Sequence, residues 1–363
     1  MPLQPTTLHL AISPEKQAVS CFTKISSEYP QNTPPSYNEI LNSGNAFPEG
    51  PVRWDTIGKA IQKTMAANHY KSFQNAFIAF EIMGSPSQMG IVGVIPSKEL
   101  NDSVQIHEAI DEKRAAKFAK YLKTVGYQAE PCVLAFQEDK KWHEIQESIR
   151  LLPIGKTFSI EGRMHRLWRI TDHQKTVFEN LNRYFNHQHH EFTLVDGHHR
   201  KQAIQTLEAQ SIATPLLCYC LPHTAITSKS FFWQSQHYPP SIATWVKSKG
   251  LPLKIVPDTL SDPNVVLIRV QKIWYEFRDA NYRSILQKIY EAFASHAIPI
   301  DYQPQKDPQI NAEASQNKAP FFMAYSPLNF EQVMSWAKKN ECLPPKTTYL
   351  EPKVPLGLFL HSV

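Results

Sequence analysis

The sequence contains no apolar run long enough to cross a membrane. A spanning helix needs about 18 to 20 consecutive apolar residues, and none of the 363 residues lies in such a run. The opening residues, from Met1 to Thr7, have neither the basic start nor the apolar stretch of a secretory signal. We therefore expect a cytoplasmic protein with no membrane segment.

Cysteine is scarce and forms no recognisable pattern. The chain has 5 cysteines, of which only Cys218 and Cys220 are close together. A Cys-x-Cys pair on a strand is not a zinc spacing, and reduced thiols are usual in a long cytosolic chain. We expect no disulfide framework and no metal cluster held by the protein's own side chains.

A long basic stripe is also missing. The net charge is only +5, and the arginines that come nearest to a cluster are Arg163, Arg166, Arg169 and Arg183. Such a charge favours anionic ligands in general, whereas a nucleic-acid surface requires a denser basic patch. Nucleic acid is therefore not the expected partner.

The length and composition indicate about two folded regions. At 363 residues, with 42% of them hydrophobic, the chain is long for one domain and can build more than one core. We expect residues 1–74 to form an N-terminal arm and a helix, and residues 75–225 to form an α/β core. Residues 226–363 are expected to form an α-rich extension whose C-terminal tail packs back on the core. Its helical patterns cover residues 262–276, 281–296 and 328–339, and the polar stretch 301–319 is typical of a loop.

The most informative segment runs from Thr193 to Ile204 and reads TLVDGHHRKQAI. An apolar strand runs into Asp196-Gly197, and a helix then opens at His198. The first backbone N–H groups of a helix lack intrahelical partners, and the helix dipole places partial positive charge there. Gly197 allows a tight turn and a close approach of the backbone to a ligand. This layout predicts a phosphate site at the helix start, of the kind used for nucleotides.

Three side chains at this helix start can add donors for the phosphate. They are His198, His199 and Arg200, of which the arginine is best suited to bidentate contact with phosphate oxygens. Asp-Gly alone is a common turn, and adjacent histidines on a surface helix are usually solvated, so the combination carries the prediction. A zinc site is less favoured, because neighbouring helical residues face different ways and no third ligand has a suitable spacing.

Four blocks spread over nearly the whole chain share a recognisable pattern. They are Pro34–Asn38; Ile106–Glu108 with the Lys113-Arg114 helix; His165–Asp172 leading to Val195–Arg200; and Leu343–Tyr349 with Pro352-Lys353 and Gly357-Leu358. Together these blocks resemble the family catalogued as domain of unknown function 1015. Lys201 and Gln202 depart from that family, which usually has Tyr and Glu after the Asp-Gly-His-His-Arg motif.

The order of these motifs is also similar to that of the ParB and sulfiredoxin superfamily, including ParB-like free-serine kinases. That resemblance implies a ParB/sulfiredoxin-like mixed sheet with flanking helices. It also implies that Gly197, His198, His199 and Arg200 hold the phosphates of ATP, ADP or another nucleotide. The glutamate that these kinases place at an earlier helix start corresponds to Glu108.

Elementary phosphoryl-transfer chemistry suits these residues. Glu108 could accept the proton of an attacking hydroxyl group, and Asp196 could cap the helix or, as a close second, hold a Mg²⁺ ion. The simpler alternatives are a solvated or helix-capping Glu108 and a structural His107. The tail residues Lys346 and Lys353 could add cations to the site or be ordinary solvated lysines.

The resulting hypothesis is a nucleotide-dependent phosphotransferase that uses Glu108 as base and Asp196–Arg200 as phosphate site. Its substrate would be a small hydroxylated molecule, with the hydroxyl of an amino acid such as serine as the first expectation. The alternatives are a non-catalytic nucleotide-binding switch and a ParB-like protein associated with nucleic acid. The sequence does not indicate an oligomeric state.

Overall fold

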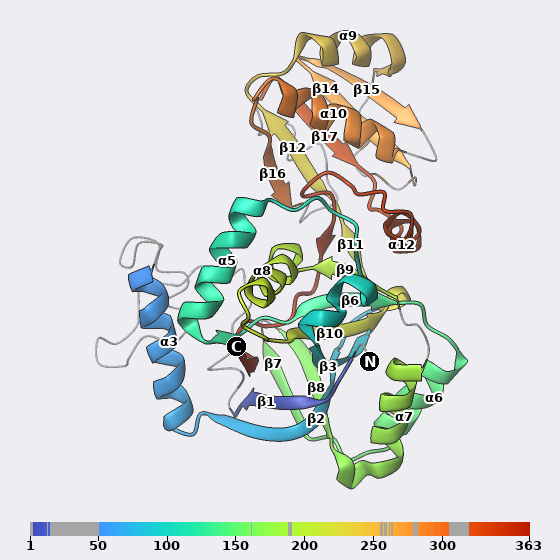
Figure 1. Ribbon diagram of the computed structural model, residues 1–363. Helices are drawn as coiled ribbons and strands as arrows, with labels where there is room; N and C mark the ends of the chain where they lie inside the picture. The colour runs from blue at the N-terminus through green and yellow to red at the C-terminus, as the bar shows by residue number, and fades with distance from the viewer. Residues whose placement is uncertain are drawn as a thin grey trace. The chain divides into compact units, whose positions relative to one another are not determined.

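The chain forms two compact units. Unit 1 comprises Met1–Gln105, Ile110–Ile226 and Pro352–Val363, and unit 2 comprises Ile106–Ala109 and Thr227–Glu351. Unit 1 thus includes both the residues expected to form a separate N-terminal arm and helix, 1–74, and the last residues of the expected C-terminal tail, Pro352–Val363. The computed structural model (Figure 1) describes residues 3–12, 14, 51–160, 162–187, 191–254, 257, 260, 262, 264–278, 282–304 and 319–363.

Unit 1 is built on a large mixed sheet, as the sequence predicted. Its strands follow the order β4-β9-β6-β10-β3-β2-β1-β19-β5, with β8 paired to β2 and β7 to β8. The strands β6 and β10 run parallel, whereas β10 and β3 run antiparallel. The strands are β1 (Thr6–Ala11), β2 (Tyr70–Ile82), β3 (Gln88–Ile95), β4 (Val104–Ile106), β5 (Tyr127–Gln128), β6 (Cys132–Phe136), β7 (Lys156–Ile160), β8 (Arg163–Ile170), β9 (Phe192–Asp196), β10 (Leu216–Pro222) and β19 (Phe359–Ser362).

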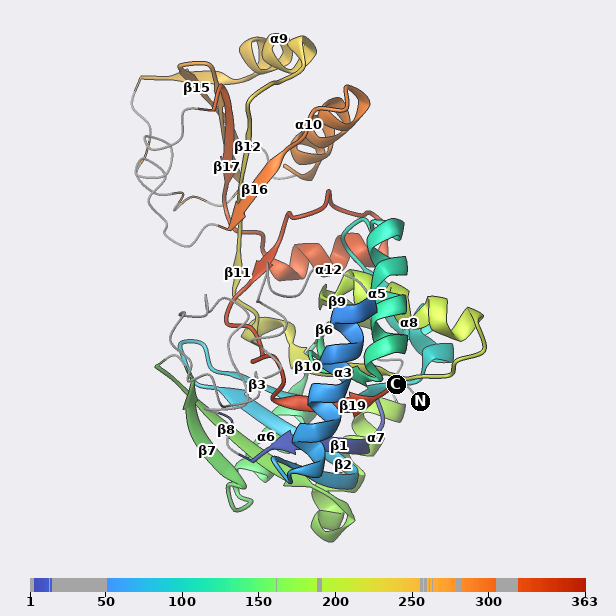
Figure 2. The ribbon, with the colours of Figure 1, turned by 90° about the vertical axis from the view of Figure 1, so that its left-hand side faces the viewer.

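The helices of unit 1 begin and end at residues that suit helix termini. The Asp111 carboxylate accepts hydrogen bonds from the backbone N–H groups of Lys113 and Arg114 at the start of α5, and Gly126 ends this helix with φ 77°. α5 packs against α8 and α3 (Figures 1 and 2). The helices are α3 (Pro51–Ala66), α4 (Leu100–Ser103), α5 (Glu112–Val125), α6 (Lys140–Arg150), α7 (Lys175–His187) and α8 (His198–Ala209).

The core of unit 1 lies between its sheet and its helices. The whole of β6 is buried, as is typical of a strand with an uninterrupted apolar run. The ring centroid of Phe136 lies 5.0 Å from that of Trp142 and 5.6 Å from that of Phe185, so aromatic side chains join β6 to α6 and α7. Burial of such a side chain stabilises the fold by about 2–3 kcal/mol. This rigid layer supports the strand end from which α8 starts.

Both chain ends add strands to this sheet. His9 of β1 pairs with Leu360 of β19, and β19 continues to β5. Residues 6–11 are therefore a strand in a region that the sequence analysis had assigned to an extended arm, while the helix expected before residue 75 is α3. The Pro34–Asn38 block lies outside the described residues.

Unit 2 contains a second sheet and three described helices. The strand order is β13-β15-β14-β17-β12-β16, and a separate pair joins β11 to β18. The strands are β11 (Ser228–Lys229), β12 (Phe231–Ser235), β13 (Leu251–Leu253), β14 (Val265–Val270), β15 (Ile273–Arg278), β16 (Asp301–Pro304), β17 (Phe321–Tyr325) and β18 (Tyr349–Leu350). The helices are α9 (Pro240–Lys249), α10 (Arg283–Ser295) and α12 (Phe330–Lys338).

Unit 2 contains more β-strand than the α-rich extension that the sequence analysis predicted. The helix predicted over 262–276 is wrong, because these residues form the hairpin of β14 and β15, with Gln271 at φ 61° in its turn. Because β14 has apolar side chains on both faces, its sequence lacks the alternation of a half-buried strand and can be mistaken for a buried helix. Its β-branched valines nevertheless favour a strand. The helices predicted over 281–296 and 328–339 are present as α10 and α12. Of the expected loop 301–319, the first four residues form β16, and residues 305–318 lie outside the described residues.

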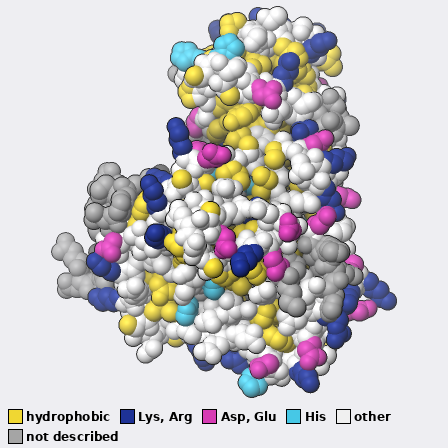
Figure 3. Space-filling view, in the orientation of Figure 1, with side chains coloured by type: hydrophobic (Ala, Val, Ile, Leu, Met, Phe, Trp, Pro, Cys, Tyr) yellow, Lys and Arg dark blue, Asp and Glu magenta, His cyan; other side chains and the backbone are white. Residues whose placement is uncertain are grey.

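The surface carries mixed charge. On the coloured part of the face in Figure 3, Lys and Arg side chains lie interspersed with Asp and Glu side chains. Within the described residues, no helix has both the length and the apolar character needed to cross a membrane.

Candidate functional site

The predicted strand, turn and helix are present in unit 1. β9 ends at Asp196, Gly197 turns the chain with φ 101°, and α8 begins at His198. A side chain cannot replace the glycine hydrogen here. A Cβ atom at Gly197 would lie 2.4 Å from Cys132 Sγ and 3.0 Å from Arg200 Nε. Both the left-handed backbone and the close approach of β6 therefore require glycine.

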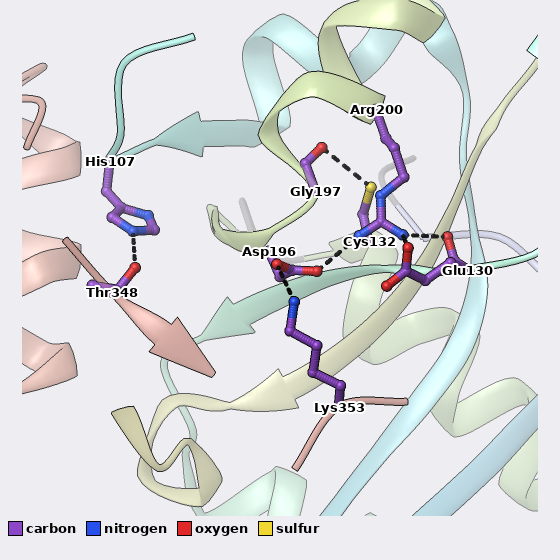
Figure 4. A network of polar contacts seen from close by, with 8 residues as sticks. All are labelled: His107, Glu130, Cys132, Asp196, Gly197, Arg200, Thr348 and Lys353. Carbon is purple, nitrogen blue, oxygen red and sulfur yellow. Dashed lines mark hydrogen bonds and ion pairs between the residues drawn. The ribbon is translucent and has the colours of Figure 1, made fainter. Parts of the chain in front are cut away.

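Arg200 is held by two carboxylates of unit 1 (Figure 4). Its Nη1 atom lies 2.6 Å from Glu130 Oε2 and donates to the Glu130 carbonyl at 2.9 Å. Its Nη2 atom donates to Asp196 Oδ2 at 2.8 Å. The arginine side chain is 13% exposed, so the guanidinium is fixed in place yet reachable from one side. Glu130 lies 70 residues away from Arg200 in the chain, and no local sequence pattern predicted the contact between them.

Asp196 does not cap α8, which corrects the first of the two roles expected for it. The N-cap residue is Gly197, and no side chain donates or accepts a capping hydrogen bond there. The Asp196 carboxylate instead bridges two cations: it accepts from Arg200 and, through Oδ1, from Lys353 Nζ at 3.2 Å. The tail thus places Lys353 at the site, whereas Lys346 lies in unit 2 with its ammonium 5.8 Å from the Phe231 ring.

The charges around Asp196 set its protonation. Burial by itself would raise the pKa of Asp196, but Lys353 and Arg200 hold that pKa well below its usual range. Burial raises the pKa of the neighbouring Cys132 thiol to about 12, despite the nearby Arg200 charge. At neutral pH the carboxylate is therefore ionised and the thiol is neutral, which excludes Cys132 as a thiolate nucleophile.

The two histidines of the motif have different surroundings. His198 is buried, with 5% of its surface exposed. His199 Nε2 lies 3.4 Å from the backbone nitrogen of Asp111, whose N–H donates to it, so the starts of α8 and α5 are joined. Lys201, at the position where the resemblance expected tyrosine, is also buried, and its Nζ donates to Gln205 Oε1 at 3.4 Å. Burial lowers the pKa of this lysine.

A cavity of about 610 Å³ adjoins Arg200 within unit 1. We name it the Arg200 cavity. Among the described residues, its wall combines basic side chains with aromatic rings and one carboxylate, that of Glu130. The lining residues that carry the argument are Lys113, Arg114, Lys117 and Arg200, and the rings of Trp54, Phe118 and Tyr121. The sequence analysis did not anticipate the aromatic wall, because it comes from two helices that are far apart in the chain.

Glu108 belongs to unit 2, and the predicted phosphate site belongs to unit 1. Glu108 is 8% exposed and forms a parallel bridge with Leu343, so it is not a solvated carboxylate. Asp111, and not Glu108, caps α5. Burial raises the pKa of Tyr302 and of Tyr325, and the charge of Glu108 adds to both shifts.

His107 has the structural surroundings that the sequence analysis favoured. It is fully buried, its Nε2 atom lies 3.0 Å from Thr348 Oγ1, and its ring meets the edge of Phe330 (Figure 4 shows the contact with Thr348). Across the described ranges, no three His, Cys, Asp or Glu side chains gather in a way that could hold a metal ion.

The sequence profile that matches this chain covers residues 23–214 and is described as a protein of unknown function, DUF1015. No curated protein matches the chain with significant similarity.

Solved structures resemble the chain weakly. SbnI from Staphylococcus aureus, with a C-terminal truncation, is 10% identical and has a TM-score of 0.45 over 73% of this chain and 85% of that chain. A mutant free serine kinase in complex with ADP is 13% identical, with a TM-score of 0.45 over 74% of this chain and 92% of that chain. A conserved hypothetical protein from Pyrococcus furiosus is 15% identical, with a TM-score of 0.43 over 75% and 94%.

Proposed function

The chain belongs to the family described as a protein of unknown function, DUF1015, and we propose that its unit 1 binds a nucleotide for phosphoryl transfer to a small hydroxylated substrate. The observation that carries the proposal is the Arg200 cavity, which pairs basic side chains with aromatic rings. Its volume of about 610 Å³ lies within the range of cavities that enclose small ligands.

The aromatic wall suits the base of a nucleotide. The Trp54 and Tyr121 rings stand at 90° with centroids 6.0 Å apart, and the Phe118 centroid lies 6.3 Å from that of Tyr121. Such rings offer both faces and edges to a flat heterocycle, and they bury apolar surface at low entropic cost. The base of ATP or ADP would therefore rest between α3 and α5.

The basic wall suits the phosphates. Lys113, Arg114 and Lys117 lie along one side of α5, and Arg200 supplies a bidentate donor from α8. Lys353 shares the charge of Asp196, so an incoming phosphate at Arg200 has to displace Glu130 from Nη1 and to compete with a partly neutralised Asp196 at Nη2. The backbone N–H groups at the start of α8, with Gly197, His198 and His199, would add further stabilisation through the positive end of the helix dipole.

Glu108 is the proposed general base, as the resemblance to ParB-like free-serine kinases implies. The substrate oxygen would attack the terminal phosphorus of ATP, the bond to the bridging oxygen would break, and ADP would leave. The proton of the hydroxyl would pass to the Glu108 carboxylate.

Mg²⁺ would reach the site together with the nucleotide. This ion keeps several waters and binds mainly to phosphate oxygens with one or two carboxylates. Asp196 and Glu130 are the carboxylates that contact Arg200. A site with two carboxylates fits a phosphate-borne ion better than a metal bound by protein alone.

Binding is tested by calorimetry with ATP and ADP in the presence of Mg²⁺. Replacing both Lys113 and Lys117 by alanine should weaken binding at least about tenfold, since a charge-assisted hydrogen bond contributes about 1.5–3 kcal/mol. The matched control replaces Lys120 and Lys123, which are exposed on the same helix and do not line the cavity. Equal affinity in the two double variants, or no binding by the natural chain, would refute the nucleotide site.

Transfer is tested separately, with ATP and a panel of hydroxylated amino acids followed by ³¹P NMR. Glu108→Gln should slow phosphorylation of the acceptor about a hundredfold or more while nucleotide affinity stays the same. Nucleotide binding without a phosphorylated product from any acceptor would refute the transferase and leave a nucleotide-binding switch.

A further inference from the structure

We propose that unit 1 has a second ligand site, specific for a small organic anion that carries a phosphate or carboxylate group on an apolar body. The site is a cavity of about 400 Å³ where β8 and β7 branch from β2 of the large sheet, formed by β1, β2, β7, β8 and the turn before β7. We name it the Arg169 cavity. It shares no lining residue with the Arg200 cavity.

The sheet register brings the lining residues to one face. Lys71 and Phe73 are two residues apart on β2, and Lys71 pairs with Leu10 of β1. Leu167 and Arg169 have the same spacing on β8. Because side chains on a strand alternate between faces, each pair projects on the same side of its strand. The cavity is thus a product of pairing between distant strands.

The basic side chains surround one aromatic ring. Lys71 Nζ lies 5.6 Å from the centroid of Phe73, and Arg169 Cζ lies 5.2 Å from the same centroid. Lys156 Nζ donates to the carbonyl of Ile12 at the rim of the cavity. Two cations that share one ring repel each other, and an anion bound between them relieves that repulsion.

The site contains no compensating acid. In the described part of the chain, none of Lys71, Lys156 and Arg169 forms an ion pair with a carboxylate, and the cavity lining contains no Asp or Glu. Gln174 adds a neutral donor, because its side-chain oxygen already accepts from Thr171 and its amide N–H groups remain. An anion therefore displaces no carboxylate of the described residues when it binds, and it competes only with the Ile12 carbonyl for Lys156.

The apolar lining of the Arg169 cavity determines what kind of ligand body fits beside the anionic group. Leu10, Phe73 and Leu167 line it, so the part of the ligand beyond the anionic group meets apolar surface. The smaller volume, 400 Å³ against 610 Å³ in the Arg200 cavity, favours a body of about one ring or a short alkyl chain over a whole nucleotide.

The experiment uses the full chain and calorimetric titration with phenyl phosphate, inorganic phosphate and phenol. Phenyl phosphate should bind, inorganic phosphate should bind more weakly, and phenol should not bind, because both the charge and the apolar body contribute. Arg169→Gln and Lys156→Gln should each weaken the binding of phenyl phosphate by about tenfold. Arg183→Gln and Lys140→Gln are the matched controls, exposed residues that line neither cavity, and should leave it unchanged.

The outcomes separate this site from the nucleotide site. Equal phenyl phosphate affinity in Arg169→Gln and Arg183→Gln would overturn the proposal, as would an absence of binding to the natural chain. Loss of phenyl phosphate binding in the Lys113 and Lys117 double alanine variant, with no effect of Arg169→Gln, would assign the anion to the Arg200 cavity and also overturn it. Failure of ATP to bind would refute the proposed function without affecting this result.

Discussion

The two cavities of unit 1 differ in whether their basic side chains are paired with carboxylates. At the Arg200 cavity the guanidinium is already paired with Glu130 and Asp196, and Lys353 completes a network of two cations and two carboxylates. At the Arg169 cavity, Lys71 and Arg169 lie over the Phe73 ring, and the described lining residues include no acid. Ion pairs within the protein hold the donor groups in a defined geometry, but the ligand has to displace their carboxylates when it binds. Uncompensated cations bind an anion directly but are less firmly positioned.

The largest expected effect comes from breaking the geometry on which the first cavity depends. Gly197→Ala should lower the free energy of unfolding by about 3 kcal/mol, because it combines left-handed strain with an overpacked contact at Cys132 Sγ. Urea denaturation measures this loss. Gly126→Ala is the control, since φ there is 77° but nothing lies within 4 Å of the added methyl group, and it should cost about 1 kcal/mol. Equal losses would mean that the close approach to β6 has no energetic importance.

A second prediction removes the acid that Arg200 and Lys353 share. Asp196→Asn should destabilise unit 1 by about 2 kcal/mol at pH 7, because it leaves two half-buried cations with weaker partners. The effect should depend on pH. The folded-state pKa of Asp196 is depressed, so its contribution is complete above about pH 4, the unfolded value. It is lost as the pH falls from there toward the folded-state pKa.

Denaturation at several pH values checks the sign. The difference in unfolding free energy between the natural chain and Asp196→Asn should shrink as the pH is lowered below about 4. A difference that stays constant between pH 7 and pH 3 would contradict the ionised bridge between Arg200 and Lys353.

A third prediction makes the Arg200 cavity resemble the Arg169 cavity. Glu130→Gln removes the carboxylate that competes with a phosphate for Arg200 Nη1. Affinity for ATP, measured by calorimetry without Mg²⁺ so that the loss of a possible metal ligand does not contribute, should rise about fivefold, in keeping with the modest free energy of a partly exposed ion pair. Weaker ATP binding in this variant would show that Glu130 holds Arg200 in the binding geometry, and that this role outweighs its competition with the ligand.

The smallest effect concerns salt. Binding of phenyl phosphate at the Arg169 cavity should weaken by about threefold between 50 and 300 mM NaCl, because exposed cations are screened by ions in solution. ATP bound at the half-buried Arg200 should lose less affinity per charge over the same range. Equal salt dependence per charge at both sites would contradict the difference in burial that distinguishes them.

Several features of the fold were predictable because they depend on neighbouring residues. The buried strand β6 followed from the apolar run Cys132–Phe136, and the strand, turn and helix around Gly197 followed from the Asp-Gly-His-His-Arg motif. The hairpin of β14 and β15 was not predicted. In β14 the side chains of both faces are largely buried, which removes the alternation that distinguishes a half-buried strand from a helix.

The partners of the site residues were not predictable in the same way. Arg200 contacts Glu130, which is 70 residues away in the chain, and Asp196 contacts Lys353, which is 157 residues away. The sequence analysis named Lys353 only as one of two tail lysines that could reach the site, and it left Asp196 between a cap and a metal ligand. In a single sequence, nothing distinguishes a lysine that will be paired from one that will be solvated.

Sequence alone determined local conformations such as the glycine turn into α8, whereas the cap of α5 is Asp111 and not Glu108, the residue that the sequence analysis had offered. Backbone sterics and capping hydrogen bonds act over a few residues, so the residues that cause these conformations are neighbours in the sequence. Only the tertiary structure decided that Arg200 is compensated while Arg169 is not. Electrostatic balance depends on which distant strands and tails the core brings together, and packing of the whole unit sets that pairing.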